Sequence, residues 1–546
     1  MNGFSPEAMS GYYRIPMAAG ECINFGEERK RAPTQTDDRV RGRPISGHDE
    51  HHHLNDPAIN RTVWQPPILV AVVTATALAM RLAFLGAKSF DLDEAVSISY
   101  ARLGWVSFRR AVASDVNMGL YYGLLKVWRH LGESEASLRA LSVILAVATV
   151  PAVYALGRHL FSHRVGLIAA LLLAVNPFHI RYAQQARGYS LVVLLVVLSC
   201  MFFVQALERP SRRDVAGYLT ASVLAVYSHV FAGLVLLAQW ISLVIPRPTR
   251  VPMNALRMSA AMVALLALPL AVLGARRRQL SWIPPIGVQI RDFFANGGGT
   301  FSAPLLVAYI AACLAAVVCL GMVWRSRKGS WQAWRYALLL SWLGLPILAT
   351  LLVSTVTPMF SPRYLIVCLP PLILLAAAGF SQINQRWLLA LGLTVVVALA
   401  LRGDYYYYTS ATLKEDFREA TRHVLTRAQP GDAVLFIAGY VRAPFEYYRS
   451  RLHRTAAGEG IVILPEDVSD GRKDLPQPYD RVWLFLSHDQ YFPTVERSIV
   501  ASLAARYHAM EERSFYGVRV RLYSARLQEW RIVGVERAAT ATAGNQ

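Results

Sequence analysis

The stretch Ile68-Leu-Val-Ala-Val-Val-Thr-Ala-Thr-Ala-Leu-Ala-Met-Arg-Leu-Ala-Phe-Leu-Gly-Ala-Lys-Ser-Phe-Asp-Leu-Asp-Glu-Ala95 decides the fold class of this chain. Its apolar part belongs to a segment from about 66 to 87 that is long enough for a membrane helix. Directly after that segment stand the carboxylates Asp91, Asp93 and Glu94. A carboxylate cluster at the mouth of a membrane span indicates chemistry at the membrane surface, so an integral-membrane enzyme is the leading hypothesis.

The composition agrees with a membrane protein. The chain has 546 residues, of which 54% are hydrophobic and 17% charged, and its mean hydropathy is +0.32. Those values are too apolar for a soluble protein of this length, so we predict a polytopic membrane protein. The formal net charge is +20. Because Lys and Arg lie mainly in loops, cytoplasmic loop bias and anionic lipid headgroups explain this charge, and no nucleic-acid partner is expected.

Neither the cysteines nor the histidines form a pattern that predicts a metal centre or a disulfide framework. The five cysteines are Cys22 in the polar head and Cys200, Cys313, Cys319 and Cys368 in apolar runs. The run His48-Asp-Glu-His-His-His53 could bind a transition metal, but a solvated tail is the favoured interpretation because no supporting residues accompany it.

Apolar stretches that can form membrane helices recur along the chain. They run approximately from 66 to 87, 137 to 156, 165 to 180, 189 to 206, 255 to 275, 303 to 324, 336 to 356, 364 to 380 and 386 to 402. The stretch 216 to 245 is too long for one crossing and short for two. Basic loops stay in the cytoplasm only if it crosses twice, which predicts about 11 transmembrane helices.

The same loop charges orient the chain. Basic clusters near Arg158, Arg209, Arg247 and Arg325 then lie in the cytoplasm, whereas Arg276-Arg-Arg278 lies outside and violates the rule. We therefore predict three parts. They are a disordered cytoplasmic leader at 1–63, a transmembrane catalytic domain at 64–402, and a small extracytoplasmic α/β domain at 403–546.

The last part shows mixed helix and strand patterns. Helical periodicity covers 414 to 427 and about 494 to 507, and strand-like runs cover 433 to 437, 481 to 486 and 517 to 523. Its function cannot be read from the pattern.

With this topology, four separate clusters reach one outer face: Asp91 to Glu94, Asp115 to Tyr122, Arg181 to Tyr189, and Ser361 to Tyr364. Asp93 and Glu94 are adjacent, so on a helix their side chains diverge by about 100° and only one addresses a given point. One carboxylate base suffices if the donor is a sugar on a lipid phosphate, because that leaving group is already a stable anion. A hydrated helix cap is the alternative interpretation of this cluster.

Arg187 and Arg363 each stand at the outer end of an apolar span with an aromatic residue nearby. A guanidinium there can hold phosphate oxygens bidentately, although snorkelling explains either arginine taken singly. Arg139, Lys126 and His229 are weaker candidates of the same kind. The rings of Tyr121, Tyr122 and Trp128 could stack on a sugar, but interfacial packing is the competing interpretation.

Several motifs in order carry a family resemblance. They are Asp93-Glu94, Asn117-Met-Gly-Leu-Tyr-Tyr122, Leu138-Arg-Ala-Leu-Ser142, Tyr154-Ala-Leu-Gly-Arg158, Asn176-Pro-Phe178, Gln184-Gln-Ala-Arg-Gly-Tyr-Ser190, Tyr227-Ser-His229 and Pro362-Arg-Tyr364. This succession resembles bacterial GT-C glycosyltransferases, and more narrowly the protein-mannosyltransferase-like group that uses polyprenyl-phosphate sugars and includes the lipid A aminoarabinose and galacturonic acid transferases.

The resemblance implies an inverting sugar transfer at the outer face of the bacterial inner membrane. It implies that the acidic pair Asp93 and Glu94 carries the base. From the residues themselves we predict that Arg187 and Arg363 hold the donor phosphate from opposite sides of one cavity. Possible substrate-binding residues are Asp115, Asn117, Tyr121, Tyr122, Arg139, Gln185, Tyr189, His229 and Tyr364. No cofactor is expected, a divalent metal stays open, and the acceptor is an envelope lipid, glycan or protein.

Two departures from the family pattern concern acceptor choice and any metal site. Gln185 replaces an acid, and Asn117-Met-Gly119 replaces a Pro-Pro motif. A transporter or flippase of a lipid-linked sugar is the rival hypothesis, but the span limits above enclose no Asp or Glu and we find no inverted repeat. A non-catalytic membrane scaffold is the third.

Overall fold

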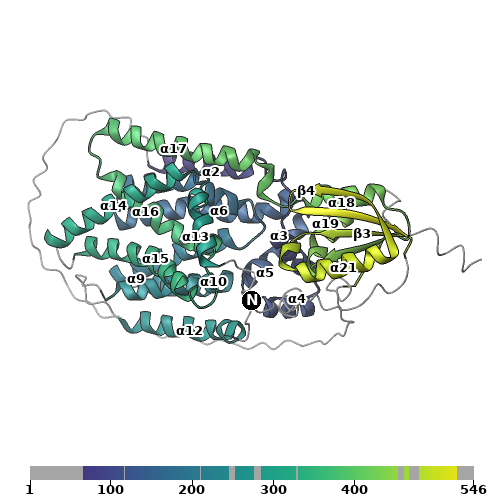
Figure 1. The fold of residues 1–546 in the computed structure, drawn as a ribbon. Coiled ribbons are helices and arrows are strands. Elements are labelled where there is room, and N and C mark those ends of the chain that lie inside the picture. The colour runs from purple at the N-terminus through teal and green to yellow at the C-terminus, as the bar shows by residue number, and fades with distance from the viewer. Residues whose placement is uncertain are drawn as a thin grey trace, which may run out of the picture.

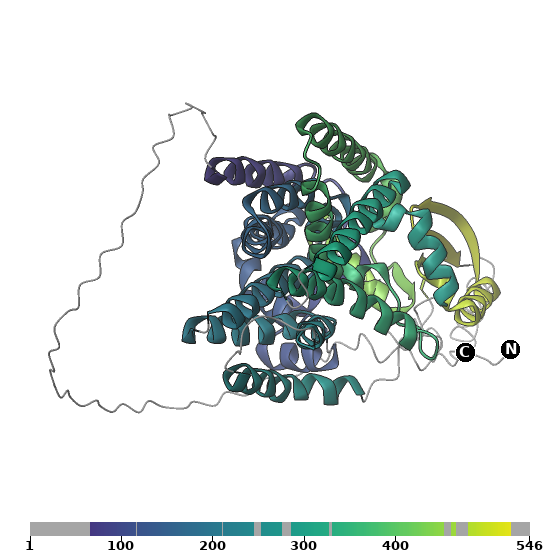
Figure 2. The same cartoon turned by 90° about the vertical axis from the view of Figure 1, so that its left-hand side faces the viewer.

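The computed structural model describes residues 66–525 apart from 116, 210, 245–252, 276–284, 327–329, 453–459 and 466–478. The predicted leader and Arg276 to Arg278 lie outside the described residues. Long helices gather in one body, and a sheet with its own helices lies at one end of that body (Figure 1). In the view turned by 90°, the helical body faces the viewer and partly covers the sheet (Figure 2).

The helical body contains most of the predicted apolar stretches. The helices on these stretches are α2 (Pro66–Leu82), α6 (Glu135–Leu160), α7 (His163–Ala174), α8 (Pro177–Ala183), α9 (Tyr189–Glu208), α10 (Arg212–Ser228), α11 (Ala232–Ser242), α12 (Met253–Ala275), α14 (Ala303–Ser326), α15 (Trp331–Val353), α16 (Leu369–Ser381) and α17 (Arg386–Thr409). The segments between them contain α3 (Leu92–Arg102), α4 (Trp105–Ser114), α5 (Gly119–Trp128), α13 (Ile286–Ala295) and the 3₁₀ segment η3 (Pro362–Cys368).

Among the described residues, six helices are long and apolar enough to cross a membrane, and α7 with α8 forms a seventh crossing if this pair, bent by 59°, is one span. The chain is therefore a multi-pass membrane protein. The helices α2 and α11 are apolar but shorter, and the apolar part of α12 from Asn254 to Leu270 belongs to the same group. The stretch 216 to 245 divides into α10 and α11 at His229, as two crossings require, but the total of 11 stays a prediction.

The break between α7 and α8 is held by a buried cation. Pro177 cannot donate a backbone hydrogen bond, and Asn176 caps α8 by accepting from the backbone N–H of His179 at 3.0 Å. Arg81 is fully buried and donates to the carbonyls of Ala174 at 2.9 Å and Leu173 at 3.1 Å. The guanidinium thus bonds the carbonyl of Ala174 at the helix break and adds a second bond to that of Leu173, which also accepts from the backbone N–H of Asn176 at 3.3 Å.

Helix α17 continues beyond the predicted domain boundary at 402 to Thr409. This extension carries Asp404, which is only 2% exposed. A buried acid therefore lies in a helix that we treat as a membrane span. The span limits predicted from the sequence ended at 402 and so enclosed no Asp or Glu.

The tail folds around a five-stranded sheet with the order β2-β1-β3-β5-β4. Its strands are β1 (Ala433–Ile437), β2 (Val462–Ile463), β3 (Arg481–Leu486), β4 (Tyr507–Phe515) and β5 (Val518–Ala525). Strand β1 pairs in parallel with both β2 and β3, whereas β5 is antiparallel to β3 and β4. The predicted strands are present; β2 and β4 were not predicted.

Helices cover both faces of this sheet. They are α18 (Phe417–Arg427), α19 (Arg442–Leu452) and α21 (Pro493–Arg506). Alternate residues of β1 and β3 point to opposite faces, so Phe436 and Phe485 join the core that continues into the membrane helices. Leu435 and Leu484 instead join a second core beneath α21.

The sheet and its helices dock on the segment that precedes α3. The ring of Tyr447 packs edge-on against Phe90 with 4.9 Å between centroids. The hydroxyl of Tyr448 accepts a hydrogen bond from the backbone N–H of Phe90 and donates one to Glu135, both at 2.8 Å. Arg418 forms an ion pair with the same Glu135 at 2.6 Å. These contacts hold the tail against the acidic segment, and α19 lies beside α3 in Figure 1.

Candidate active site

The acidic segment folds as a capped helix start. Asp91 is the N-cap of α3 and accepts a hydrogen bond from the backbone N–H of Glu94 at 2.9 Å. Glu94 returns the bond by accepting from the backbone N–H of Asp91 at 3.3 Å, which completes a capping box. The side chain of the middle carboxylate, Asp93, takes no part in this cap and contacts Arg363 instead.

Glu94 lies in a saturated buried cluster. Arg139 donates to its two oxygens at 2.8 and 2.9 Å, and Lys414 from the tail donates to Oε2 at 2.6 Å. The backbone N–H of Ala186 adds a bond to Oε1 at 2.9 Å. The Glu94 and Arg139 side chains are 0% and 1% exposed. Both oxygens of Glu94 are therefore engaged, and the residue connects three distant parts of the chain.

Asp93 has a different environment. Its side chain is 29% exposed, and its Oδ2 accepts a hydrogen bond from Arg363 Nη1 at 2.7 Å. Arg187 Nη2 lies 3.9 Å from the same oxygen. The two arginines predicted to share one site thus converge on one carboxylate, although they are 176 positions apart in the sequence.

Arg187 is fixed by a polar ring of partners. Its Nη1 donates to Ser97 Oγ at 3.3 Å and to Tyr122 Oη at 3.2 Å. The Tyr122 hydroxyl in turn donates to Asp115 at 2.7 Å. Ser142 donates to the backbone carbonyl of Arg187 at 3.2 Å. This network orients the guanidinium toward Asp93 before any ligand is bound.

Aromatic and amide side chains extend the site from Arg363. Asn117 Nδ2 lies 3.3 Å from His229 Nε2, and the His229 ring lies 5.4 Å from the Tyr364 ring between centroids. Tyr189 is buried, and its ring lies 6.1 Å from His229. The structure therefore brings Asn117, His229, Tyr364 and Tyr189 into one wall.

The remaining sequence candidates divide into supporting and remote positions. Tyr121 bonds Ser142 at 2.7 Å, and the backbone carbonyl of Gln185 accepts from the N–H of Arg187 at 2.8 Å, so both buttress the site. Lys126 instead bonds the carbonyls of Ala101 and Leu103. Among the described residues it makes no hydrogen bond or ion pair with the cluster around Asp93, so the structure does not bring Lys126 into the site.

Charge and burial shift the pKa of Asp91, Asp93 and Glu94 in different directions or to different extents. Burial raises the pKa of Asp93, but the charges of Arg187 and Arg363 outweigh burial and hold that pKa below its ordinary value. For Glu94, burial is likewise outweighed by Arg139 and Lys414, which lower its pKa to about 2. Burial and then the charge of Glu94 raise the pKa of Asp91 to about 6. Asp93 is thus ionised and partly accessible at neutral pH.

Sequence reasoning missed the contributions of the tail. Lys414 lies within the predicted helix start but was not assigned to the site, and its Nζ is also 3.7 Å from Asp91. His488, in the loop after β3, lies close enough to Asp93 for their charges to influence each other's pKa. No local pattern marks either residue, because only the packing of the tail brings them there.

In the described part of the chain, no group of three or more His, Cys, Asp or Glu side chains is arranged to hold a metal ion.

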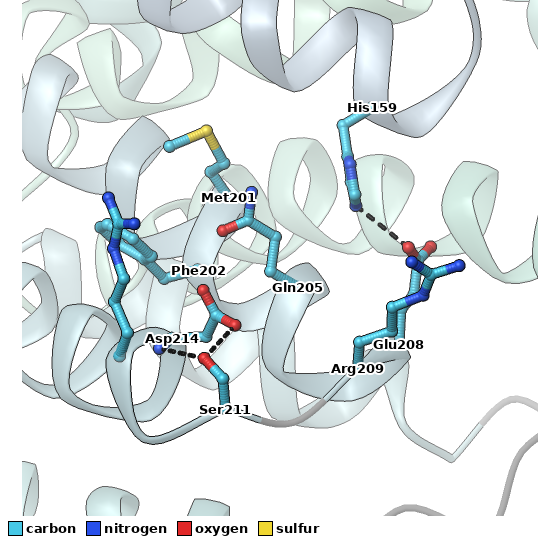
Figure 3. Close-up of a pocket in the computed structure, with 9 residues that line it drawn as sticks. His159, Met201, Phe202, Gln205, Glu208, Arg209, Ser211 and Asp214 are labelled. Carbon is cyan, nitrogen blue, oxygen red and sulfur yellow. Dashed lines mark hydrogen bonds and ion pairs between the residues drawn. The ribbon is translucent and has the colours of Figure 1, made fainter.

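A separate cavity of about 690 Å³ lies where α6, α9 and α10 meet (Figure 3). It is lined by His159, Met201, Phe202, Gln205, Glu208, Arg209, Ser211, Arg213 and Asp214. Helix α9 begins beside Arg187 and ends at this cavity, and a helix of 20 residues spans about 30 Å. The cavity is therefore at the opposite end of the helical body from Asp93 and is not part of the candidate active site.

The fold and this cluster define a multi-pass membrane protein with a charged site at the end of the body that meets the tail. Residues 122–273 match the profile of the family described as dolichyl-phosphate-mannose-protein mannosyltransferase. This match confirms the resemblance to protein-mannosyltransferase-like glycosyltransferases that the motifs predict. Arg187 lies within the matched segment, whereas Asp93 and Arg363 lie outside it.

Solved structures with a similar arrangement are distant in sequence. ArnT from Cupriavidus metallidurans is 14% identical with a TM-score of 0.49, covering 84% of this chain and 98% of that one. The Archaeoglobus fulgidus oligosaccharyltransferase is 11% identical with a TM-score of 0.49, covering 86% and 75%. Arabinofuranosyltransferase AftD from Mycobacteria is 16% identical with a TM-score of 0.44, covering 84% and 41%. No curated protein sequence matches the chain.

Proposed function

We propose that this protein is an integral-membrane inverting glycosyltransferase that moves a sugar from a polyprenyl-phosphate donor to an envelope lipid, glycan or protein acceptor. The observation that carries the proposal is the convergence of Arg187 and Arg363 on Asp93, at 3.9 and 2.7 Å from one carboxylate oxygen. This arrangement combines one base with two cations for a phosphate. The family match of residues 122–273 supports the same class of donor.

The reaction needs one base and an anion-binding pair. An acceptor hydroxyl oxygen attacks the anomeric carbon while the bond from that carbon to the donor phosphate oxygen breaks. The phosphate leaves with the electron pair, and Asp93 takes the hydroxyl proton. One displacement inverts the anomeric carbon, and no general acid is needed because the leaving phosphate is already a stable anion.

The arginines connect donor binding to the strength of the base. Without a donor, Arg363 and Arg187 hold the pKa of Asp93 low and so make it a weak base. A donor phosphate competes for both guanidinium groups, which prefer bidentate oxyanions. The negative charge of the phosphate also offsets part of the positive charge that the two arginines place beside Asp93. We therefore infer that donor binding raises the pKa of Asp93 and frees its Oδ2 for the acceptor.

The geometry favours Asp93 over Glu94 as the base. Both oxygens of Glu94 are occupied by Arg139, Lys414 and the backbone N–H of Ala186. A proton could reach Glu94 only after this cluster opened, and burial between two cations makes its carboxylate a weak proton acceptor. We assign Glu94 the task of positioning α3, and with it Asp93.

A transporter of a lipid-linked sugar remains the second candidate because of one observation. Asp404 is buried in α17, and neither of its carboxylate oxygens has a hydrogen-bond partner among the described residues. Proton-coupled transporters use such acids. In a transporter, Asp404→Asn should abolish function while Asp93→Asn preserves sugar transfer to the acceptor. The transferase predicts loss of transfer in Asp93→Asn.

The decisive experiment compares envelope glycolipids and glycans by mass spectrometry. A strain that lacks this protein is complemented with the wild type, Asp93→Asn or Asp404→Asn. We expect one sugar modification to disappear in the deletion strain, to return with the wild type, and to remain absent with Asp93→Asn despite normal membrane insertion. Full restoration by Asp93→Asn would reject the proposed chemistry.

We also propose that the site and the tail face the extracytoplasmic side of a bacterial inner membrane. After the native cysteines are replaced, a cysteine at position 450 should react with a membrane-impermeant thiol reagent in intact spheroplasts. A cysteine at position 326 should react only after permeabilisation. The reverse pattern would place the tail in the cytoplasm.

A further inference from the structure

The strands β1 and β3 of the tail sheet create a topological switch point, and the proposed reaction assigns no role to it. Strand β1 pairs in parallel with β2 on one side and with β3 on the other. The chain therefore leaves β1 toward one edge through α19 and later crosses to β3 on the other side. In open α/β sheets, ligands bind beyond the carboxyl ends of strands at such a point.

The loops at this point have strained backbones. Ala438, directly after β1, has a φ of 64°, and His488, after β3, has a φ of 58°. Residues with side chains avoid this left-handed region unless the surrounding structure holds them there, and such residues concentrate at functional sites. The loop after β3 is held in part by Asp489, which accepts a hydrogen bond from Arg519 on β5.

These loops present aromatic rings. The His488 ring stacks on Tyr491 with 6.3 Å between centroids and 18° between planes, and it lies 6.1 Å from Tyr440 in the loop after β1. Tyr491 is 44% exposed. An aromatic face that remains accessible beside polar groups is the surface on which a sugar ring can stack, because the ring offers apolar contact and its hydroxyl a polar one.

The rings also adjoin the catalytic segment. His488 Nε2 lies 3.5 Å from Glu415, the neighbour of Lys414, which bonds Glu94. His488 and Asp93 are close enough to interact electrostatically. The switch point of the tail therefore lies next to the proposed base, although different parts of the chain build them.

We propose that Tyr440, His488 and Tyr491 at the β1/β3 switch point form a saccharide-binding platform, which holds the sugar of the acceptor while its hydroxyl reaches Asp93. The proposal rests on the transferase function for its role but not for its binding chemistry. The platform residues bind and position the acceptor; they exchange no proton.

Binding is tested directly with a simple probe. Saturation-transfer NMR is recorded with the methyl glycosides of glucose, galactose, mannose and arabinose on the full-length protein, in a detergent without a sugar headgroup. We expect Tyr491→Ala to weaken the strongest signal, with affinity about two- to tenfold lower on the scale of one aromatic contact. Tyr491→Phe keeps the ring and should retain the signal. Since Tyr491 is exposed, neither change should unfold the tail.

A matched control uses another histidine of the same sheet. His508 on β4 pairs with Ser524, which pairs with Arg481 at the start of β3, so His508 lies at the opposite end of the sheet from His488. His488→Gln should reduce the signal and His508→Gln should not. Equal signals in the wild type, Tyr491→Ala and His488→Gln, or no signal in the wild type, would overturn the platform.

The two proposals fail in different ways. If the transferase function is wrong, Asp93→Asn leaves the envelope glycans unchanged, while the NMR experiment still decides whether the platform binds saccharide. If only the platform is wrong, Asp93→Asn abolishes transfer but Tyr491→Ala transfers sugar as well as His508→Gln does. In a functional platform, Tyr491→Ala raises the KM for acceptor and leaves farnesyl phosphate binding unchanged.

Discussion

Asp93 and Glu94 are neighbours in sequence, yet the structure places them in opposite surroundings. Glu94 is 0% exposed and bound on both oxygens by Arg139 and Lys414, while Asp93 is 29% exposed and faces Arg363. The first is a closed cluster with no room for a ligand. Asp93 is a carboxylate whose neighbouring cations, Arg187 and Arg363, can bind a ligand phosphate instead. Adjacent acids on a helix point about 100° apart, and here that angle separates support from chemistry.

The comparison teaches that an acidic pair need not act as a pair. Glu94 connects α6, the segment between α8 and α9, and the tail through Arg139, Ala186 and Lys414. Removing this anchor should change where Asp93 stands without touching the reacting atoms. Variants of Asp93 should therefore lose activity, whereas variants of Glu94 should lose stability. These two measurements test whether the residues have different roles.

The largest expected effect is on the rate with Asp93→Asn. An amide cannot accept the acceptor proton, and loss of a general base typically costs about 10² to 10⁴ in rate. The purified variant should keep the thermal unfolding midpoint of the wild type because Asp93 is partly exposed. Transfer is measured with envelope acceptors in membranes. Wild-type rates in Asp93→Asn would move the base to another residue and erase the distinction from Glu94.

Glu94→Gln should mainly reduce stability. Breaking a buried ion pair by removing one partner typically costs about 3–5 kcal/mol, because it leaves buried charge uncompensated. Here Arg139 and Lys414 would both lose their anion. The thermal unfolding midpoint is compared with that of Glu135→Gln, which removes the charge of a pair whose side chains are 22% and 19% exposed. A Glu94→Gln protein as stable as Glu135→Gln would contradict the anchoring role.

Replacement of the arginines should give an intermediate effect on the donor alone. A lysine keeps the charge but cannot form the planar fork, and a hydrogen bond to a charged group is worth about 1.5–3 kcal/mol. Arg363→Lys and Arg187→Lys should each weaken binding of farnesyl phosphate, measured by calorimetry, roughly tenfold or more. Arg209→Lys, at the opposite cavity, is the control. An unchanged affinity in both site variants would remove the phosphate from this site.

The smallest effect concerns stability at acid pH. The pKa of Glu94 is lowered from 4.5 to about 2, so its contribution is complete above pH 4.5 and is lost as pH falls toward 2. Asp91 acts in the opposite direction: its pKa is raised from 3.8 to about 6, so its contribution declines as pH rises through that window. Thermal unfolding midpoints should fall between pH 4.5 and 2 in the wild type and less so in Glu94→Gln.

The local sequence pattern explains which features of the fold and of the site could be predicted. The acidic segment, Arg187 and Arg363 at the ends of spans, and most apolar stretches were visible because membrane helices need long apolar runs and charged residues avoid them. The strands at 433 to 437 and 481 to 486 were visible for a similar reason, since both faces are buried. The strand β4 was missed because its residues are mostly exposed, which leaves no apolar alternation to detect.

The sequence by itself determined the class of the molecule: a multi-pass helical membrane protein with carboxylates and arginines at the ends of spans and a mixed tail. Tertiary structure alone decided which carboxylate is free. Arg139 and Lys414 are 45 and 320 positions from Glu94, and Arg363 is 270 from Asp93. A buried charge must find its partner wherever packing brings one, so these pairings follow from the fold and leave no trace in local spacing.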